Sequence, residues 1–345
     1  MWSRFLNVEL KPGRILFTAA VLNCCRDSLK ILLLVLLSCA ANAEQVQDEN
    51  APFRIFSWNI SNNAFERDKS GFAAILRRAD PDVVLLDEVS PAASMDELLG
   101  LLNEIRPASD RVWRINRGVS GGRQRGVIAS HMSIEKLAEF GSVVSYPEPV
   151  MRYVTEAMSA TERANPGLVM TNGIPVNGAI VIVNGKRLLV VIADLQCCGT
   201  TPDSWQDYRR RAEAQAIRDR VRQILRRTDV DGVIVAGDFN AVNTPIPLHI
   251  LMGPYEPPHA ALIPAVVFHV DGATSWTWDG RGTPFPSSAL DYQLYGPQGL
   301  IVDDGLVIDS EDFSSAEHKK YGTDEQLSSR MSEHRPLVVE YSWRQ

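Results

Sequence analysis

Hydrophobic positions along the chain follow two different periods, one typical of strands and one typical of helices. Near-continuous apolar runs such as DVVLLDEV predict strands buried on both faces, and apolar residues three or four positions apart predict amphipathic helices. An Asn184-Gly185 pair between two apolar runs predicts a β-hairpin. Strands are predicted at 53–60, 82–89, 179–183, 186–195, 233–236, 290–295 and 337–343, and helices at 70–78, 95–105 and 205–227. Hairpins mixed with strand–helix alternation indicate an α/β domain with mixed sheets.

The first 43 residues have a different pattern. Basic side chains precede the apolar run 31–37, and the small residues Ala41-Asn42-Ala43 follow it. Because the run is too short to span a membrane comfortably, residues 1–43 predict a signal peptide cleaved after Ala43, and hence an exported protein, periplasmic or extracellular. An uncleaved N-terminal anchor and lipidation at Cys39 are the alternatives. Residues 44–52 are polar and predict a tether, and residues 53–345 predict a single domain.

Composition narrows the function classes only slightly. The 345 residues are 45% hydrophobic and 22% charged, with a formal net charge of −7, which is ordinary for a globular protein. Removing residues 1–43 takes away five of the 35 basic and two of the 42 acidic side chains, so the predicted mature chain carries −10. This balance argues against a general polyanion binder.

Polar residues gather where the predicted strands stop. Such positions follow or precede six of the apolar runs: Asn59, Glu88, Asp194, Asp238, Asn240, Asp291, Glu333 and His334. Ligand sites in α/β folds collect beyond strand ends. Carboxylate and amide oxygens suit a hard cation such as Mg²⁺ or Mn²⁺, whereas the cysteine–histidine spacing of a zinc site is missing.

Five short motifs at these boundaries resemble one known family. They are SWNI at 57–60, PDVVLLDEV at 81–89, GDFNA at 237–241, TW followed by LDY at 277–278 and 290–292, and SEHRPL at 332–337. Their order is that of the endonuclease/exonuclease/phosphatase superfamily, which includes pancreatic-type DNases, abasic-site endonucleases, neutral sphingomyelinases and inositol-phosphate 5-phosphatases. The resemblance spans residues 53–343. It implies a four-layer α/β sandwich of two packed mixed β-sheets flanked by helices, and a catalytic role for residues 53–345.

The resemblance also assigns roles to the strand-end residues. It implies that Glu88 holds a divalent cation, which is either a single ion or one of two. It also implies that Asn59 ligates this ion or lies beside it, and that Glu333 belongs to the same metal site. It implies that Asp238 and Asn240 orient the attacking water and the phosphate. Their spacing of two would put both side chains on one side of an extended segment. It further implies that His334 is the catalytic histidine, oriented and kept protonated by Asp291.

Three positions depart from the family pattern. Glu333 replaces the usual aspartate before the last histidine, and Asp87 replaces the usual glutamine before Glu88. Asp194 stands where relatives carry histidine or tyrosine. An ionised aspartate cannot donate a hydrogen bond to phosphate. A second cation, an arginine partner or a different substrate approach would compensate, and the acidic site favours more than one metal ion.

The function predicted from these residues is an exported, divalent-metal-dependent phosphoester hydrolase. Its substrate is a small metabolite, a lipid headgroup or a nucleic acid. A secreted nuclease and, from another class, a non-catalytic binding module are the alternatives. We expect a monomer without a stable nucleic-acid complex.

Three further stretches have competing interpretations. Cys197 and Cys198 would be the only cysteines left after cleavage at Ala43, either as a strained vicinal disulfide or as two free, buried thiols. The basic stretch 209–227 favours a solvated helix face over a nucleic-acid surface. The segment 121–126, GGRQRG, lacks the ending of a phosphate-binding loop and is interpreted as a basic loop over the site.

Overall fold

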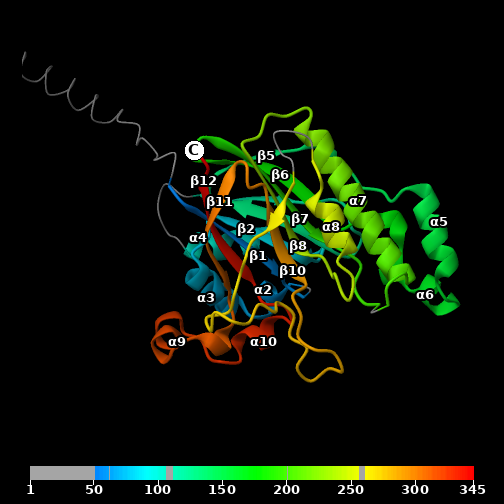
Figure 1. Cartoon of the computed structure of the whole chain (residues 1–345). Coiled ribbons are helices and arrows are strands. Elements are labelled where there is room, and N and C mark those ends of the chain that lie inside the picture. Colours follow the sequence, from blue (N-terminus) through cyan, green and yellow to red (C-terminus); the bar gives the residue numbers. More distant parts are fainter. Residues whose placement is uncertain (1–50, 62, 106–111, 200, 256–260) are drawn as a thin grey trace, which may run out of the picture. The chain divides into compact units, whose positions relative to one another are not determined.

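Two six-stranded sheets form the centre of the computed structural model, which describes residues 51–61, 63–105, 112–199, 201–255 and 261–345 (Figure 1). The predicted signal peptide and most of the predicted tether lie outside these residues. Described residues belong to one compact unit. No helix within the described ranges is both long enough and apolar enough to cross a membrane.

Each sheet mixes parallel and antiparallel neighbours. The first has the order β11-β12-β1-β2-β4-β3 and the second β5-β6-β7-β8-β10-β9, with β1 parallel to β2 and β7 parallel to β8. The first sheet consists of β1 Phe53–Asn59, β2 Val83–Val89, β3 Arg114–Arg117, β4 Arg125–Ser130, β11 Leu300–Val307 and β12 Leu337–Trp343. The second consists of β5 Ser133–Lys136, β6 Val176–Val183, β7 Lys186–Asp194, β8 Gly232–Asp238, β9 Ile263–Pro264 and β10 Asp291–Tyr295.

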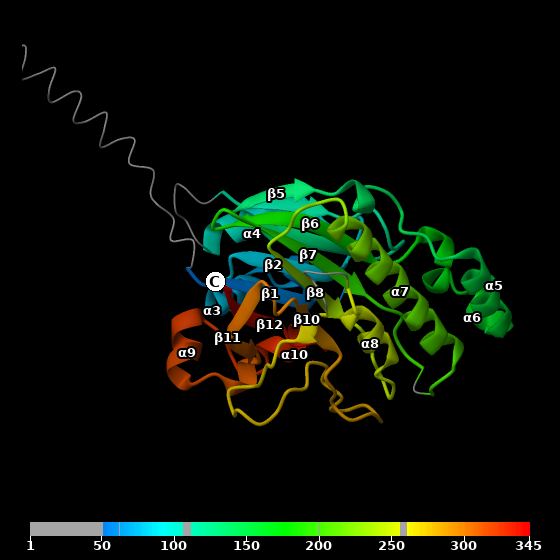
Figure 2. The ribbon, with the colours of Figure 1, turned by 45° about the horizontal axis from the view of Figure 1, so that its top comes forward.

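Helices cover the outer face of each sheet, as Figures 1 and 2 show. On the first sheet they include α3 and α4, and on the second α7 and α8. The helices are α2 Ala64–Arg67, α3 Lys69–Ala79, α4 Met95–Ile105, α5 Glu148–Ala157, α6 Ala160–Ala164, α7 Trp205–Leu225, α8 Ile246–Met252, α9 Ser315–Tyr321 and α10 Leu327–Met331. Short 3₁₀ turns are η1 Ala138–Phe140, η2 Pro166–Leu168, η3 Met170–Asn172 and η4 Ser310–Asp312.

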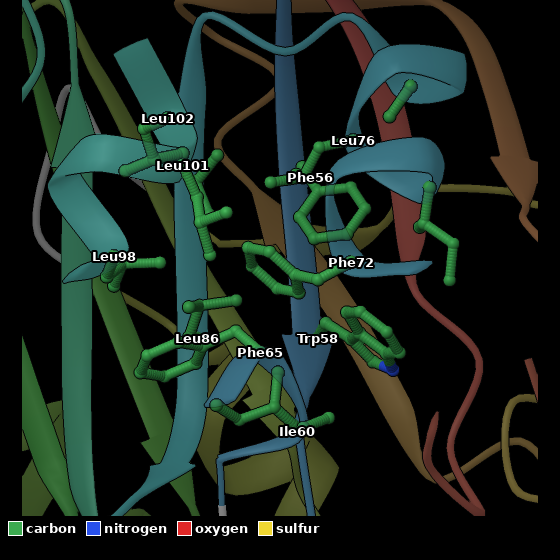
Figure 3. Close-up of a cluster of buried hydrophobic side chains, with 14 of the residues drawn as sticks. Phe56, Trp58, Ile60, Phe65, Phe72, Leu76, Leu86, Leu98, Leu101 and Leu102 are labelled. Atoms are coloured by element: carbon green, nitrogen blue, oxygen red, sulfur yellow. The ribbon is translucent and has the colours of Figure 1, made fainter. Parts of the chain in front are cut away.

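Three buried clusters hold these layers together. One lies between the two sheets and includes Ile55 and Ile234, and the other two lie between each sheet and its helices. In the outer cluster of the first sheet, Phe72 of α3 stacks on Trp58 of β1 with ring centroids 5.9 Å apart (Figure 3). The two sheets and two helical layers confirm the four-layer α/β sandwich.

The long predicted strands and helices are all present, with ends shifted by up to three residues. The edge strands β3, β5, β9 and β11 were not predicted, because they are short or largely exposed. The inner strand β4 was also missed, although it is mostly buried. The interpretation of 209–227 as a solvated face is wrong for its first turns. Arg209, Arg210 and Glu213 are buried in α7.

Candidate functional site

Strand alternation explains why the polar strand-end residues meet. Along β1, Phe53 and Ile55 face the other sheet, whereas Phe56 and Trp58 face the helices. Because side chains alternate with a period of two, the residue that ends β1 continues the row facing the other sheet. On β2, β7, β8 and β10 a polar residue at or near the strand end likewise falls in the alternating set of side chains that faces the other sheet. The polar residues that face the other sheet are therefore Asn59, Asp87, Asp194, Asp238 and Asp291.

The strand register brings these residues to one end of the two sheets. In the second sheet, Asp238 of β8 is paired with Asp194 of β7 on one side and with Asp291 of β10 on the other. In the first sheet, Asn59 is paired with Asp87. The site therefore has three aspartates on one sheet facing an asparagine and an aspartate on the other.

Hydrogen bonds tie the two sheets together at this point. The Nδ2 of Asn59 donates to Glu88 Oε1 and to Asp238 Oδ2, both at 3.2 Å. The backbone N–H of Asp238 donates to Asp87 Oδ2 at 3.1 Å. The Oδ1 of Asn59 accepts from the Ser61 backbone at 3.1 Å. Asn59 thus presents its amide nitrogen to the carboxylates, which favours a place beside a cation over direct ligation.

Glu88 owes its position to a local irregularity of β2. The pairing of β2 with β4 shifts register between Leu86 and Val89, and Glu88 has a φ of 52°. This positive φ is uncommon for a residue with a side chain, and bulges of this kind redirect a side chain next to active sites. Glu88 is only partly buried, so its carboxylate is open to a ligand.

His334 and Asp291 form the hydrogen-bonded pair that the motifs predict. Nδ1 of His334 lies 2.8 Å from Asp291 Oδ2, and Nε2 lies 3.6 Å from Asp238 Oδ2. Thr277 Oγ1 also donates to Asp291 Oδ2, at 2.7 Å. Burial lowers the pKa of His334, but the charges of Asp291 and Asp238 outweigh it and raise the pKa to about 10. The imidazole is therefore positively charged at neutral pH.

The backbone around His334 is also held in place. Trp58 Nε1 donates to the His334 carbonyl at 2.9 Å, and the His334 N–H donates to Ser332 Oγ at 3.0 Å. Ser332 Oγ donates in turn to the Asn59 carbonyl at 2.8 Å. These bonds fix the segment before β12 against the end of β1, so His334 and Asn59 are positioned together.

The carboxylates carry more negative charge than the nearby cationic groups neutralise. Burial and the charges of Asp291 and Asp238 raise the pKa of Asp87 well above its ordinary value. Burial and the charges of Glu88 and Asp238 do the same to the pKa of Asp194. Burial raises the pKa of Asp238 to about 7, against the opposing effect of His334. Such repulsion is relieved by protons or by a divalent cation.

The donor set fits a hard cation. Glu88 and Asp238 offer carboxylate oxygens, and Asp87 Oδ1 is buried without a hydrogen-bond partner among the described residues. These are the ligand types of Mg²⁺ and Mn²⁺. Asp238, Asp291 and His334 also lie close enough to share an ion. However, Nδ1 of His334 is bonded to Asp291 and the ring is protonated, so we assign this group to acid–base and charge chemistry.

Two predicted site residues take positions that the sequence did not indicate. Asn240 has a φ of 45°, so the segment after Asp238 is not extended. Its N–H donates to Asp238 Oδ1 at 2.9 Å, and its Nδ2 donates to the Leu195 carbonyl at 3.0 Å. Glu333 is exposed and accepts from Trp278 Nε1 at 3.4 Å. Within the described ranges no hydrogen bond joins Glu333 to Asn59 or Glu88, and its metal role stays a prediction.

Sequence reasoning left two residues out of the site. Asp87 was noted only as a departure from the family pattern, yet it anchors the backbone of Asp238. Thr277 was quoted only as part of a motif, yet it holds Asp291. The parity of β2 was the signal that could have placed Asp87 in the site, because Val83, Leu85 and Asp87 share one face.

Buried charges on α7 support the loop after Asp194. The Glu213 carboxylate accepts from the Gln196 N–H at 2.6 Å, from Arg209 Nε at 3.0 Å and from the Tyr146 hydroxyl. The guanidinium of Arg210 donates to the carbonyls of Gln196, Cys198 and Gly199. The first turns of α7 therefore fix the conformation of residues 196–199.

Cys197 and Cys198 are both free in this structure, with their Sγ atoms 3.0 Å apart. Both are exposed, so neither the vicinal disulfide nor a pair of buried thiols describes the structure. The hydrogen bond between the two thiols lowers the pKa of Cys198 to about 6, opposed by partial desolvation and assisted by the charge of Arg210. The pKa of Cys197 is raised by the same bond and by burial.

Comparison with known proteins identifies the class to which this fold and site belong. The profile of the Endonuclease/Exonuclease/phosphatase family matches residues 56–329, most of the chain. The protein therefore belongs to this family, whose members are generally phosphoester hydrolases. A comparison with curated protein sequences found no match.

Solved structures share the fold at low sequence identity. An endonuclease/exonuclease/phosphatase from Bacteroides vulgatus matches with a TM-score of 0.52 and 14% identity over 85% of this chain and 100% of that one. TDP2 from Caenorhabditis elegans matches with a TM-score of 0.51 and 14% identity over 90% and 80%. The human Nocturnin catalytic domain, solved with a bound sulfate, matches with a TM-score of 0.50 and 16% identity over 85% and 94%. These likenesses concern the fold.

Proposed function

We propose that this protein is an exported, divalent-metal-dependent phosphoesterase that hydrolyses a phosphomonoester or phosphodiester by attack of water. One observation carries the proposal: the His334–Asp291 pair lies beside Asp238 and within one hydrogen-bonded group with Asn59 and Glu88. An acid–base pair beside an open carboxylate is what phosphoester hydrolysis requires.

The side chains divide the work as follows. With a pKa of about 7, Asp238 can accept a proton from water near neutral pH. The charged His334 stabilises negative charge on the non-bridging phosphate oxygens, and Asp291 keeps it oriented and protonated. Glu88 would hold a bound Mg²⁺ or Mn²⁺ with Asn59 beside it, and the ion would supply Lewis-acid stabilisation of the phosphoryl and leaving oxygens.

The decisive experiment is hydrolysis of a panel of phosphoesters with added metal or chelator. We expect turnover of p-nitrophenyl phosphate or bis(p-nitrophenyl) phosphate with Mg²⁺ or Mn²⁺, none in EDTA, and recovery when metal is restored. Glu88→Ala and His334→Ala should each lose activity while keeping the wild-type circular dichroism spectrum. Full activity in EDTA would contradict metal dependence.

The same panel separates the alternatives. Cleavage of DNA or RNA in preference to small esters would indicate the secreted nuclease, and the net charge of −10 for residues 44–345 argues against it. Negligible turnover of every ester, unaffected by Glu88→Ala and His334→Ala, would indicate the non-catalytic binding module.

Export is tested independently of catalysis. We expect the protein recovered outside the cytoplasm to begin at Glu44, as read by N-terminal sequencing or intact mass. A membrane-bound product that retains residues 1–43 would indicate the uncleaved anchor, and a lipid-modified N-terminus at Cys39 would indicate the lipoprotein.

A further inference from the structure

A cavity of about 380 Å³ opens directly beside Glu88. The cavity is lined by the end of β7 and the loop after it, with Asp194 and Gln196, and by the β3–β4 turn at 121–124. Parts of segments 165–169 and 172–175, together with Arg209 and Glu213 of α7, complete the lining. This volume falls within the range of small-molecule pockets, so a ligand that reaches Glu88 has room for one further small group here.

Two arginines line this cavity, and they differ in availability. Arg209 is committed to the protein, because it donates to Glu213 at 3.0 Å and to the Leu168 carbonyl at 3.1 Å. Arg123 is exposed and has no hydrogen bond or ion pair with any described residue. Its guanidinium is therefore the cationic group in the cavity that remains available to a ligand.

The turn that carries Arg123 is fixed against the protein. The Gly121 N–H donates to the Asn172 carbonyl at 3.1 Å, and the Gln124 N–H donates to the Gly121 carbonyl at 3.1 Å. Gly121 has a φ of 108°, and a Cβ there would lie 2.5 Å from Pro175 Cα. Only glycine permits this close approach. The base of the turn is thus held in place, so little ordering of the backbone opposes binding.

The charges around the cavity favour an anion at Arg123 rather than at Asp194. Asp194 and Glu88 repel phosphate oxygens, and the charge of Glu213 is balanced by Arg209, whereas the guanidinium of Arg123 attracts phosphate oxygens. A guanidinium binds phosphate through two parallel, charge-assisted hydrogen bonds. The cavity thus offers a second phosphate subsite at Arg123.

We propose that this cavity binds the part of the substrate that is not hydrolysed, and that Arg123 recognises a second phosphate group on it. The inference rests on the proposed phosphoesterase activity and narrows it to small molecules that carry two phosphate groups. Arg123 is a specificity-determining residue in this assignment, and the hydrolytic step itself belongs to His334, Asp291 and Asp238.

The test compares paired inhibitors of bis(p-nitrophenyl) phosphate hydrolysis with Mn²⁺. The pairs are adenosine 5′-monophosphate with adenosine 3′,5′-bisphosphate, and glucose 1-phosphate with glucose 1,6-bisphosphate, so that the added phosphate is varied on two scaffolds. We expect at least one bisphosphate to bind about tenfold tighter than its monophosphate, as one charge-assisted contact allows. In Arg123→Gln the ratio should fall to about twofold or less, which is the statistical advantage of two phosphates.

Arg227→Gln is the matched control, because Arg227 is an exposed arginine just after the C-terminal end of α7, whereas the cavity is lined by residues near the N-terminal end of that helix. It should retain the bisphosphate preference, and a loss as large as that in Arg123→Gln would show a non-specific charge effect and overturn the assignment. Equal preference in Arg123→Gln and wild type, or no preference in wild type on either scaffold, would also overturn it. Absence of any hydrolysis in wild type would instead overturn the proposed function, so the two failures are distinguishable.

Discussion

At the scale of single residues, the site depends on how burial and neighbouring charges set proton affinity. His334 is deeply buried, yet its two aspartate neighbours keep it protonated. For Asp238, burial disfavours the charged carboxylate and raises its pKa. A base with a pKa near neutrality beside an imidazole that is charged at neutral pH is a division of roles that suits hydrolysis at neutral pH.

The His334–Asp291 pair predicts a definite pH dependence of stability. Because the folded pKa of His334, about 10, lies above its ordinary value of 6.5, protonation favours the folded state. The stabilisation is complete below pH 6.5 and is lost as the pH rises through 10. Urea unfolding at pH 6 and pH 10.5 should show a larger loss of unfolding free energy in wild type than in His334→Gln. Parallel losses in both proteins would contradict the raised pKa.

The cysteine pair predicts selective thiol chemistry. With a pKa of about 6, Cys198 is largely thiolate at pH 7, whereas Cys197 remains protonated. Iodoacetamide at pH 7 should therefore modify Cys198 first, as located by peptide mass spectrometry. Cys198→Ser should slow the total labelling sharply, and Cys197→Ala should raise the pKa of Cys198 by removing the hydrogen bond between the two side chains. Equal labelling of both thiols would refute the assignment.

At the scale of elements, α7 does more than cover a sheet. Its buried Glu213 joins Arg209, Tyr146 and the backbone of Gln196, so the helix determines the path of the chain just after Asp194. Removing one partner of a buried ion pair leaves an uncompensated charge. The conformation of this loop is thus coupled to the stability of the outer layer.

Glu213→Ala should therefore destabilise the protein by about 3–5 kcal/mol and reduce phosphoesterase activity as the loop loses its acceptor. Asp219→Ala is the matched control on the exposed face of the same helix, where the expected change is within about 0.5 kcal/mol. Chemical unfolding of both variants gives the comparison. Similar values for the two would show that the buried network contributes nothing.

Sequence alone predicted the elements whose residues act locally. The buried strands other than β4, and the motif residues Glu88, Asp238, Asp291 and His334, could be placed because period and order are visible in the chain. The buried arginines of α7 could not, because alternating charges are usual on solvated helix faces and their partners lie in a distant loop. The left-handed conformation of Asn240 was equally hidden, since its side chain is held by the Leu195 carbonyl, a partner distant in the sequence.

At the scale of the whole molecule, the site lies at the interface between the two sheets. Asn59 and Asp87 come from one sheet and Asp194, Asp238 and Asp291 from the other, and their hydrogen bonds cross the gap. A cation bound there would stabilise both sheets against separation, because it binds the folded state alone.

Mn²⁺ should accordingly raise the melting temperature. At a hundredfold excess over Kd, the stabilisation is about 2.7 kcal/mol, and a thermal-shift titration measures it. Glu88→Ala should lose the effect. Glu333→Gln separates the two views of that residue: retention of the full shift would agree with its exposed position against Trp278, and loss would agree with the predicted metal role.

The pairing of β12 with β1 has a consequence for biosynthesis. The first strand of the sandwich, β1, has β2 on one side and β12 on the other, and β12 begins at Leu337, shortly after His334. Until residues 337–343 have been synthesised, one edge of β1 has no neighbouring strand, and His334 is not held in position beside β1. A growing polypeptide on the ribosome is therefore expected to lack the proposed hydrolytic activity until β12 has paired with β1.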